Sequence, residues 1–253
     1  MRVPRQRSIL GRLTAHGMAT TEELAALCDV SPATVRRDLV ELERQGALRR
    51  VHGGAVALEG PDADAARGFA EVAASDASEK AAVAARAAAL VQDGDCVILD
   101  IGTTTMMLAR ALGGRPVTVV TASLAVLDVL RDDDVVELVL LGGMVRRTYH
   151  SLVGALTEDA LRQVHGSHVF LGASGVQGDG TVLDTTMVEV PVKRALLRAA
   201  DRSVLLVDRH KFPGTGTLRV CGAGEVDVVV TNEGADPDTI TACRAAGTEV
   251  LFA

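Results

Sequence analysis

Short apolar runs that alternate with helical segments constrain the fold of residues 76–253 more than any other feature. The runs cover residues 96–100, 117–121, 135–141, 169–172, 203–208, 226–231 and 250–252. Regular alternation of strands and helices predicts a C-terminal α/β domain, in which helices cover both faces of a mainly parallel sheet. Ligands of such sheets bind at the carboxyl ends of strands, so polar residues after each run are the candidate contacts.

The first run ends in the sequence DIGTTT, residues 100–105, which leads into a predicted helix over residues 106–112. Gly102 lets the main chain approach a ligand closely, and the Asp100 carboxylate can accept hydrogen bonds from sugar hydroxyls. The hydroxyls of Thr103, Thr104 and Thr105, with the free N–H groups of the helix, can surround a phosphate. The alternative is a turn whose threonines bond only their own backbone, and the motif alone leaves both interpretations open.

Other strand ends supply further candidate effector contacts. They are Thr121, Gly142, Gly175, Glu189, Lys193 and Lys211. Lys211 is expected to neutralise a phosphate bound at the carboxyl ends of these strands. Glu189 and Lys193 stand four residues apart around Pro191, and the spacing favours a surface ion pair slightly over a ligand contact.

The charge of the chain is unevenly distributed. The formal net charge is −7, but residues 1–55 hold nine arginines against six acidic residues, which leaves +3 there and −10 in the rest. The acidity therefore belongs to the C-terminal part and does not exclude DNA binding by the first 55 residues.

Residues 5–44 have the pattern of three short helices. Helical spacing predicts a helix over residues 5–16 that Gly17 ends, and Thr20 with Glu23 has the spacing of a capping box for a second helix. Ser31 and Pro32 open a third helix, whose apolar residues form one stripe. Residues 48–51 before the glycines at 53 and 54 read as a β wing. The pattern predicts a winged helix-turn-helix, and the alternative is a small helical bundle with solvated arginines.

The third helix and the wing hold the candidate DNA contacts. They are Ser31, Ala33, Thr34, Arg36, Arg37, Arg49, Arg50 and His52. Small, hydroxyl and guanidinium groups suit the phosphates and base edges of a major groove, and the wing arginines suit the backbone or minor groove.

The run VSPATVRRDLVELERQGALRRVHGGA, residues 30–55, resembles the N-terminal motif of the DeoR family of bacterial repressors. A second set of segments resembles the effector domain of that family in order and spacing. These segments are Glu79-Lys80, DIGTTT, LLGGMVR, SLVG, FLGASGV, EVPVK and DRHKF. The resemblance implies a sensor domain similar in fold to ribose-5-phosphate and glucosamine-6-phosphate isomerases, which bind phosphate at a comparable turn.

The sequence departs from the family pattern at three places. Ala122 follows Thr121 where the family commonly has Asn, Pro191 lies in the Glu-to-Lys segment, and Arg209 with His210 fills positions that are usually small and hydroxylic. These departures leave the identity of the sugar open.

The resulting expectation is a DNA-binding transcriptional repressor of carbohydrate metabolism genes. Residues 1–57 form an N-terminal all-α winged helix-turn-helix domain, residues 58–75 a linker, and residues 76–253 an effector domain. Its partners are double-stranded operator DNA, a phosphorylated sugar effector and copies of itself, as a dimer or tetramer. The alternative is a sugar-phosphate isomerase with an accessory DNA-binding head, in which Asp100, Glu189 and Lys211 transfer protons. Such isomerases carry an acid pair where this chain has FLGASGV, so we expect no enzyme activity.

Several classes of protein are set aside. No apolar run is long enough to cross a bilayer, and the protein is expected to be cytoplasmic. The four cysteines are scattered without CxxC spacing, as in a reduced protein. His150, His165 and His168 lack the carboxylates or motif of a metal site, so neither a metal nor a cofactor is expected.

Overall fold

The computed structural model describes residues 2–16, 18–44, 47–51, 53–56 and 68–253, with the side chains of 2–4, 7, 14–16, 18, 44, 49, 51 and 56 left aside. The chain divides into two units, residues 1–66 and 67–253. Each unit has its own hydrophobic core.

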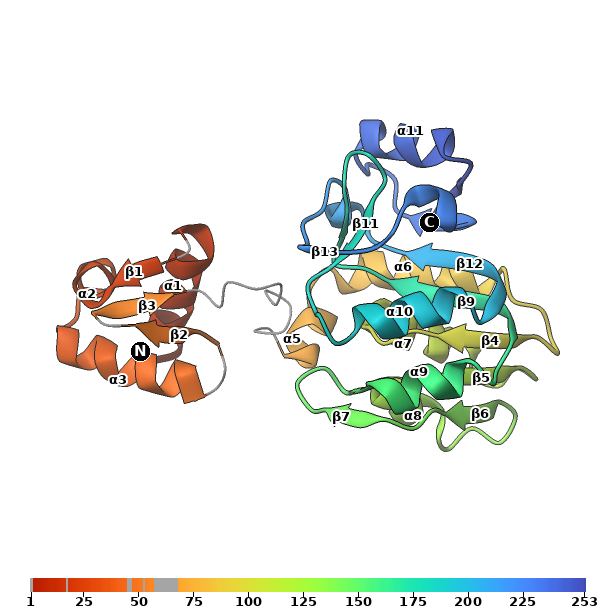
Figure 1. Cartoon of the computed structure of the whole chain (residues 1–253), viewed down its shortest axis with the longest axis horizontal. Helices are drawn as coiled ribbons and strands as arrows, with labels where there is room; N and C mark the ends of the chain where they lie inside the picture. The colour runs from red at the N-terminus through yellow and green to blue at the C-terminus, as the bar shows by residue number, and fades with distance from the viewer. Residues whose placement is uncertain (1, 17, 45–46, 52, 57–67) are drawn as a thin grey trace. The chain divides into compact units, whose positions relative to one another are not determined.

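The described residues of the first unit combine three helices with a three-stranded antiparallel sheet of order β1-β3-β2 (Figure 1). Its elements are α1 (Arg2–His16), β1 (Met18–Thr20), α2 (Thr21–Cys28), α3 (Pro32–Arg44), β2 (Arg49–Val51) and β3 (Gly54–Val56). The predicted helices and wing are present, and β1 is an additional strand that pairs with β3. A Cβ on Gly54 would lie 2.3 Å from the Ala19 carbonyl oxygen, so only glycine allows this pairing.

Two polar interactions fix the helices of this unit. The predicted capping box starts α2: the Glu23 N–H donates to Thr20 Oγ1 at 3.2 Å, and the Thr20 N–H donates to Glu23 Oε2 at 2.9 Å. Arg5 Nε donates to Asp38 Oδ2 at 2.5 Å, and the Asp38 side chain is only 3% exposed. This ion pair ties α1 to α3, so Arg5 has a structural role.

The second unit is built on a seven-stranded parallel sheet of order β15-β14-β12-β9-β4-β5-β6. Its strands are β4 (Cys96–Leu99), β5 (Thr118–Thr121), β6 (Glu137–Leu140), β9 (Gly166–Gly172), β12 (Ala200–Leu206), β14 (Val228–Thr231) and β15 (Glu249–Phe252). All seven runs identified in the sequence form these strands, so the α/β prediction with a mainly parallel sheet is confirmed.

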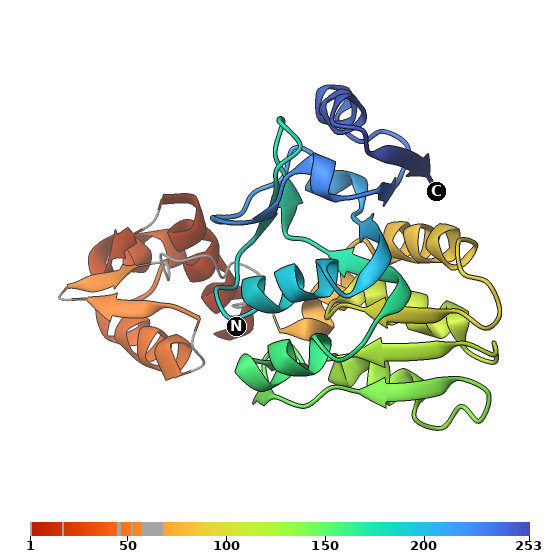
Figure 2. The same ribbon diagram turned by 45° about the vertical axis from the view of Figure 1, so that its right-hand side comes forward.

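Helices cover both faces of the sheet, as the turned view in Figure 2 shows. One core lies between the sheet and α6 (Ala77–Ala88), α7 (Thr103–Leu112) and α8 (Leu124–Leu130). The other core includes α9 (Ala155–Leu161), α10 (Val190–Leu197) and α11 (Pro237–Ala245). No described helix is long and apolar enough to span a membrane.

Two small antiparallel sheets, which the sequence did not predict, are added to this frame. One pairs β7 (Met144–Arg146) with β8 (Ser151–Val153). The other has β11 (Val182–Asp184) between β10 (Gly175–Val176) and β13 (Leu218–Cys221). Two short 3-10 helices, η1 (Arg209–Lys211) and η2 (Ala223–Glu225), complete the unit.

The end of the predicted linker is helical. Helix α5 (Phe69–Ala74) buries Phe69 and Val72, and the Lys80 ammonium donates to the carbonyl oxygens of Val72 and Ser75, each at 2.7 Å. These contacts make α5 the first helix of the second unit. Residues 57–67 of the predicted linker lie outside the described residues.

Candidate functional site

The exposed face of α3 presents the predicted DNA contacts. Ala33, Arg36 and Arg37 are exposed, while the buried stripe of the helix joins the core of the unit. Ser31 caps the helix: its hydroxyl accepts from the Thr34 N–H at 3.3 Å and lies 2.9 Å from the Thr34 hydroxyl. Ser31 and Thr34 therefore have a local use in shaping the start of the helix.

A hollow of about 540 Å³ lies between α3 and the wing. Arg36 and Arg50 both line it, and Arg50 is held there by Glu43, with Nε 2.8 Å from Glu43 Oε2. Glu43 thus holds the exposed Arg50 guanidinium of the wing in the same hollow as Arg36 of α3. The side chain of Arg49 and the whole of His52 lie outside the described residues.

In the second unit, the order of the sheet places a topological switch point between β4 and β9. The chain runs from β4 outward to β5 and β6, then returns to β9 on the other side of β4 and continues to β12, β14 and β15. The direction of winding reverses here, and in open α/β sheets ligands bind at the carboxyl ends of the strands at such a switch point. Asp100 follows β4, and its Oδ2 accepts from the N–H of Gly172, the last residue of β9, at 3.0 Å.

Lys193 of α10 is the buried cation at this switch point. Its ammonium donates to Asp100 Oδ2 and to the Gly172 carbonyl oxygen at 2.9 Å, and lies 3.5 Å from Asp184 Oδ2. All three charged side chains are buried. Burial opposes the charge on Lys193, but the carboxylates of Asp100, Asp184 and Glu189 outweigh it and hold the pKa of Lys193 above its ordinary value.

Glu189 lies at the start of the same helix and bonds elsewhere. Its Oε1 is 2.6 Å from Arg146 Nη1 of β7 and accepts from the Ser151 hydroxyl at 3.2 Å. Burial raises the pKa of Glu189 to about 7, against the opposing effect of Arg146. The surface ion pair with Lys193 is a wrong prediction: both residues are buried and bond to distant parts of the chain.

The DIGTTT turn combines structural bonds with open hydrogen-bonding capacity. The Thr105 hydroxyl donates to the carbonyl oxygens of Asp100 at 2.8 Å and Gly102 at 3.0 Å, so it stabilises the turn. The hydroxyls of Thr103 and Thr104 form no hydrogen bond with the described residues, and the first N–H groups of α7 have no partner within the helix. Asp100 Oδ1 is buried and likewise accepts no hydrogen bond from them. The turn can therefore receive an anion and a hydroxyl group.

Three other predicted contacts have structural uses. The Thr121 hydroxyl, fully buried, donates to the Leu99 carbonyl oxygen at 2.8 Å and accepts from the Ser123 N–H at 3.0 Å. The Gly142 carbonyl oxygen accepts from the Thr157 hydroxyl at 2.8 Å. A Cβ on Gly175 would lie 2.6 Å from the main chain of Gly214, so close packing requires glycine there.

Lys211 lies in η1, after β12. Because β9 separates β12 from β4, the distance between strands β12 and β4 is about two strand spacings, roughly 10 Å. Lys193 is thus the lysine at the switch point itself.

Sequence reasoning missed Asp184, Arg146 and Ser151. They come from β11, β7 and β8, short strands whose sequences carry no strong alternation. The DTT sequence at residues 184–186 is the one local signal, since Asp184 Oδ1 accepts from the N–H groups of Thr185 and Thr186 in a turn.

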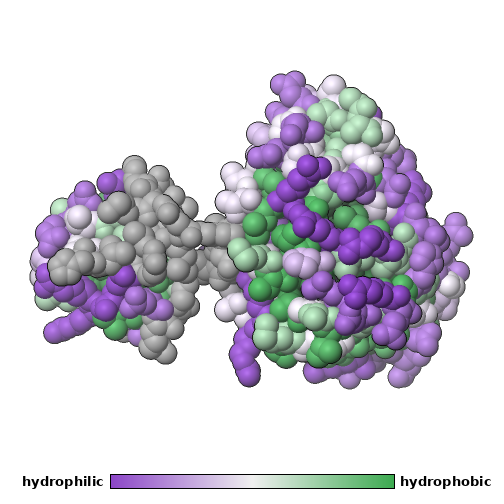
Figure 3. Space-filling view, viewed as in Figure 1, coloured by the Kyte–Doolittle hydropathy of each residue, from purple (hydrophilic) through white to green (hydrophobic). Residues whose placement is uncertain are grey.

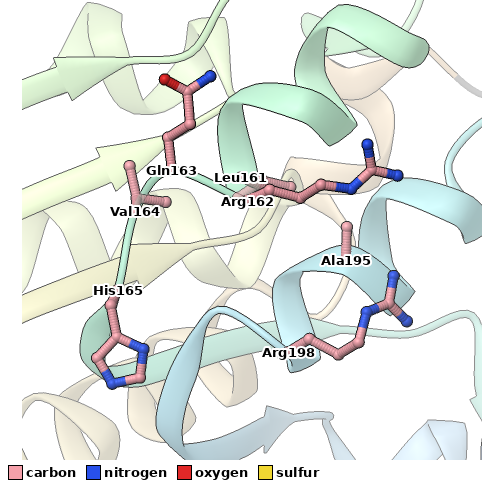
Figure 4. A pocket seen from close by; sticks show the side chains of 7 residues that line it. All are labelled: Leu161, Arg162, Gln163, Val164, His165, Ala195 and Arg198. Carbon is pink, nitrogen blue, oxygen red and sulfur yellow. The ribbon is translucent and has the colours of Figure 1, made fainter.

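A second hollow, of about 470 Å³, lies near the start of β9, at the end of that strand away from Asp100 (Figure 4). Arg162 and Arg198 lie on either side of Ala195, and they cap the C-terminal ends of α9 and α10. Helix C-termini carry partial negative charge, which disfavours an anion, so this hollow is the weaker candidate. No group of histidine, cysteine and acidic side chains among the described residues is arranged to hold a metal ion.

Comparison with family models decides the classification. The model of the DeoR-like helix-turn-helix domain matches residues 5–60, and that of the DeoR C terminal sensor domain matches residues 75–233. The chain belongs to the DeoR family. It is a transcriptional regulator with a DNA-binding domain and a sensor domain.

Relatives in this family have similar lengths and are named as regulators. An aga operon transcriptional repressor of Escherichia coli is 31% identical over 249 residues, which cover 98% of this chain and 93% of the relative. The repressor GlcR of Bacillus subtilis is 32% identical, covering 89% and 86%. The glycerol-3-phosphate regulon repressor of Haemophilus influenzae is 31% identical, covering 90% and 89%.

Among solved structures, ribose 5-phosphate isomerase A of Methanocaldococcus jannaschii matches 54% of this chain and 55% of its own. The TM-score is 0.41 and the identity 20%, a likeness too remote to assign an activity.

The departures from the DeoR pattern at residues 209 and 210 alter one rim of the sensor domain. Arg209 Nη2 lies 2.6 Å from Glu79 Oε1, and His210 Nε2 lies 3.2 Å from Glu79 Oε2. Small hydroxylic residues could not form the Arg209–Glu79 ion pair, so this part of the sensor domain carries a cation that the family pattern does not imply.

Proposed function

We propose that this DeoR-family chain represses carbohydrate metabolism genes and that a phosphorylated sugar controls its binding to DNA. One observation carries the proposal: a single chain combines a helix with exposed arginines and a buried cluster of charged side chains at the switch point of an α/β sheet. The switch point supplies a carboxylate for sugar hydroxyls and the N-terminus of α7 for an anion.

The proposed effector contacts are Thr103, Thr104, the main-chain N–H groups of the turn and Asp100 Oδ1. Lys193 holds the Asp100 carboxylate in place, and Lys211 follows β12, the next strand but one from β4. A helix N-terminus favours an anion, so the phosphate is placed at the start of α7.

Arg36 and Arg37 are proposed to contact operator DNA directly. Replacing either with Ala is expected to weaken operator binding by about 1–3 kcal/mol where the residue reads a base, and to lower affinity for all sequences where it contacts phosphate. Fluorescence anisotropy with DNA fragments selected from a random library measures the effect, and Arg162→Ala in the sensor domain is the control. Wild-type affinity in both variants would remove these arginines from the interface.

A dimer is proposed as the DNA-binding form, because one recognition helix covers few base pairs and two-fold sites require paired heads. We expect the second copy to cover exposed apolar residues of the sensor domain, among them Met144, Leu156 and Met187, which are 65%, 72% and 69% exposed. Figure 3 shows apolar atoms in this region, over β7 and the first turns of α9 and α10. Sedimentation is expected to give a dimer or a multiple of it for the wild type and a lighter species for Leu156→Asp. A wild type that sediments as a monomer, free and on DNA, would contradict the proposal.

The proposed effector is phosphorylated. Thr104→Val removes one hydroxyl from the turn. It is expected to weaken the binding of a sugar phosphate about tenfold to a hundredfold, since a hydrogen bond to a charged group contributes about 1.5–3 kcal/mol. Calorimetry on the full chain, with Thr241→Val on the exposed face of α11 as the control, measures the change. Equal binding of a sugar and its phosphate ester by the wild type would move the phosphate elsewhere.

The chain is proposed to bind its effector without converting it. Sugar-phosphate isomerases carry an acid pair where this chain has FLGASGV, and the Glu189 Oε1 oxygen is already bonded to Arg146 and Ser151. Formation of an isomer from ribose 5-phosphate or glucosamine 6-phosphate would support the isomerase alternative instead.

A further inference from the structure

A chain of contacts leads from the proposed effector site to α5. Arg146 contacts two side chains: its Nη1 donates to Glu189, and its guanidinium carbon lies 5.2 Å from the centre of the Tyr149 ring. The Tyr149 ring in turn meets the edge of Phe69, the first residue of α5, with ring centres 5.6 Å apart. One cation therefore contacts both a carboxylate of the site and the aromatic residue on which α5 packs.

Helix α5 packs against α7 and the residues around Tyr149. Phe69 packs with Met106, which follows Thr105 in the first turns of α7, and stacks on His150 at 5.4 Å between ring centres. Its N–H donates to the Thr148 carbonyl oxygen at 3.3 Å. At the other end, Lys80 binds the last carbonyl oxygens of α5. Helix α5 is the first described helix after residues 1–66, so a change in its docking occurs where the chain enters the second unit.

We propose that Arg146 is a positioning residue that couples occupancy of the effector site to the docking of α5; this proposal rests on the proposed function. A phosphate is a stronger and geometrically better partner for a guanidinium than one carboxylate oxygen. An effector phosphate at α7 draws Arg146 toward the site and away from the Tyr149 ring. Phe69 then loses the surface that Tyr149 provides, and α5 undocks.

The chain contains its own probe for this movement. Tyr149 is its single tyrosine, and there is no tryptophan, so ultraviolet-excited emission from the full chain comes from Tyr149. Ribose 5-phosphate, glucose 6-phosphate and glycerol 3-phosphate are titrated into the wild type, with the unphosphorylated compounds and inorganic phosphate as comparisons. Calorimetry gives binding, and anisotropy with selected DNA gives release.

In the wild type, the phosphate ester that binds is expected to change Tyr149 emission over the same concentrations that release DNA. Phe69→Leu keeps an apolar side chain and leaves the site untouched, so it is expected to bind this ligand as the wild type does. The change in DNA affinity that the ligand causes is expected to be at least about fivefold smaller in this variant than in the wild type. Arg146→Lys keeps the charge but not the planar group, and is expected to abolish most of the emission change. The neighbouring Arg147→Lys, whose side chain is exposed, is the matched control and should respond as the wild type does.

A ligand that binds and releases DNA without changing Tyr149 emission would overturn the coupling, as would full release by Phe69→Leu. Binding by none of the phosphate esters would overturn the proposed function and the coupling together. Hydrogen exchange gives a measurement independent of DNA: the amides of α5 are expected to exchange faster in Phe69→Leu and in ligand-bound wild type. Unchanged exchange in the ligand-bound wild type would also contradict the proposal.

Discussion

Lys193→Met is expected to destabilise the protein by roughly 3–5 kcal/mol, because it leaves buried carboxylates without their cation. Asp100 and Asp184 are 1% and 5% exposed, and both face the Lys193 ammonium. Methionine fills a similar volume, so the loss measures the charge and not a cavity. We also expect the variant to bind the effector poorly, because Asp100 is no longer held at the end of β4.

Urea unfolding of the full chain measures the loss, with Arg198→Met at the end of the same helix as the control. The control is expected to stay within about 0.5 kcal/mol of the wild type, since its side chain is exposed. Part of the stability should return to Lys193→Met as the pH falls, because protonation neutralises the carboxylates that the lysine no longer balances. A variant as stable as the control at pH 7 would show that Lys193 does not balance them.

The stability of Glu189→Gln relative to the wild type is expected to increase as the pH rises. In the folded chain the pKa of Glu189 is raised from 4.5 to about 7 by burial, so between these values the folded state binds a proton that the unfolded state has released. The stabilisation from this proton is fully present below pH 4.5 and is lost as the pH rises through 7. Glutamine does not titrate, so the difference between variant and wild type should move toward the variant by roughly 2–3 kcal/mol between pH 5 and pH 8.

Chemical unfolding at a series of pH values tests this sign, and the exposed Glu233→Gln serves as control. A difference that does not change with pH, or that moves toward the wild type at high pH, would mean that Glu189 is charged throughout and that Arg146 outweighs its burial.

The frame of the molecule could be predicted because its signals are local. Apolar runs such as residues 96–100 specify buried strands wherever they pair, and Thr20 with Glu23 specifies a helix start through bonds within four residues. The short strands β7, β8, β10 and β11 were not predicted, because two or three residues are too few to show a periodic hydrophobic pattern. Helix α5 was not predicted, because its alanine-rich sequence becomes a packed helix only through contacts with Lys80 and with the aromatic residues around Phe69.

The site was predicted in part, for the same physical reason. The DIGTTT turn was found from its own sequence, but Lys193 meets Asp100 across 93 positions and Glu189 meets Arg146 across 43. Four-residue spacing on a helix suggested instead that Glu189 and Lys193 pair with each other. Thr121 and Gly175 resemble ligand contacts in sequence, because a hydroxyl or a glycine at a strand end serves a tight turn equally well.

The central claim, that a phosphorylated sugar controls DNA binding, is tested most directly by one titration. Full-length protein bound to a selected DNA fragment is titrated with a sugar phosphate and, in parallel, with the same sugar without its phosphate, while anisotropy follows the complex. We predict that one of the phosphate esters changes DNA affinity by at least about fivefold and that its free sugar leaves the affinity unchanged. Equal effects of ester and free sugar, or DNA affinity that no sugar phosphate alters, would contradict the account.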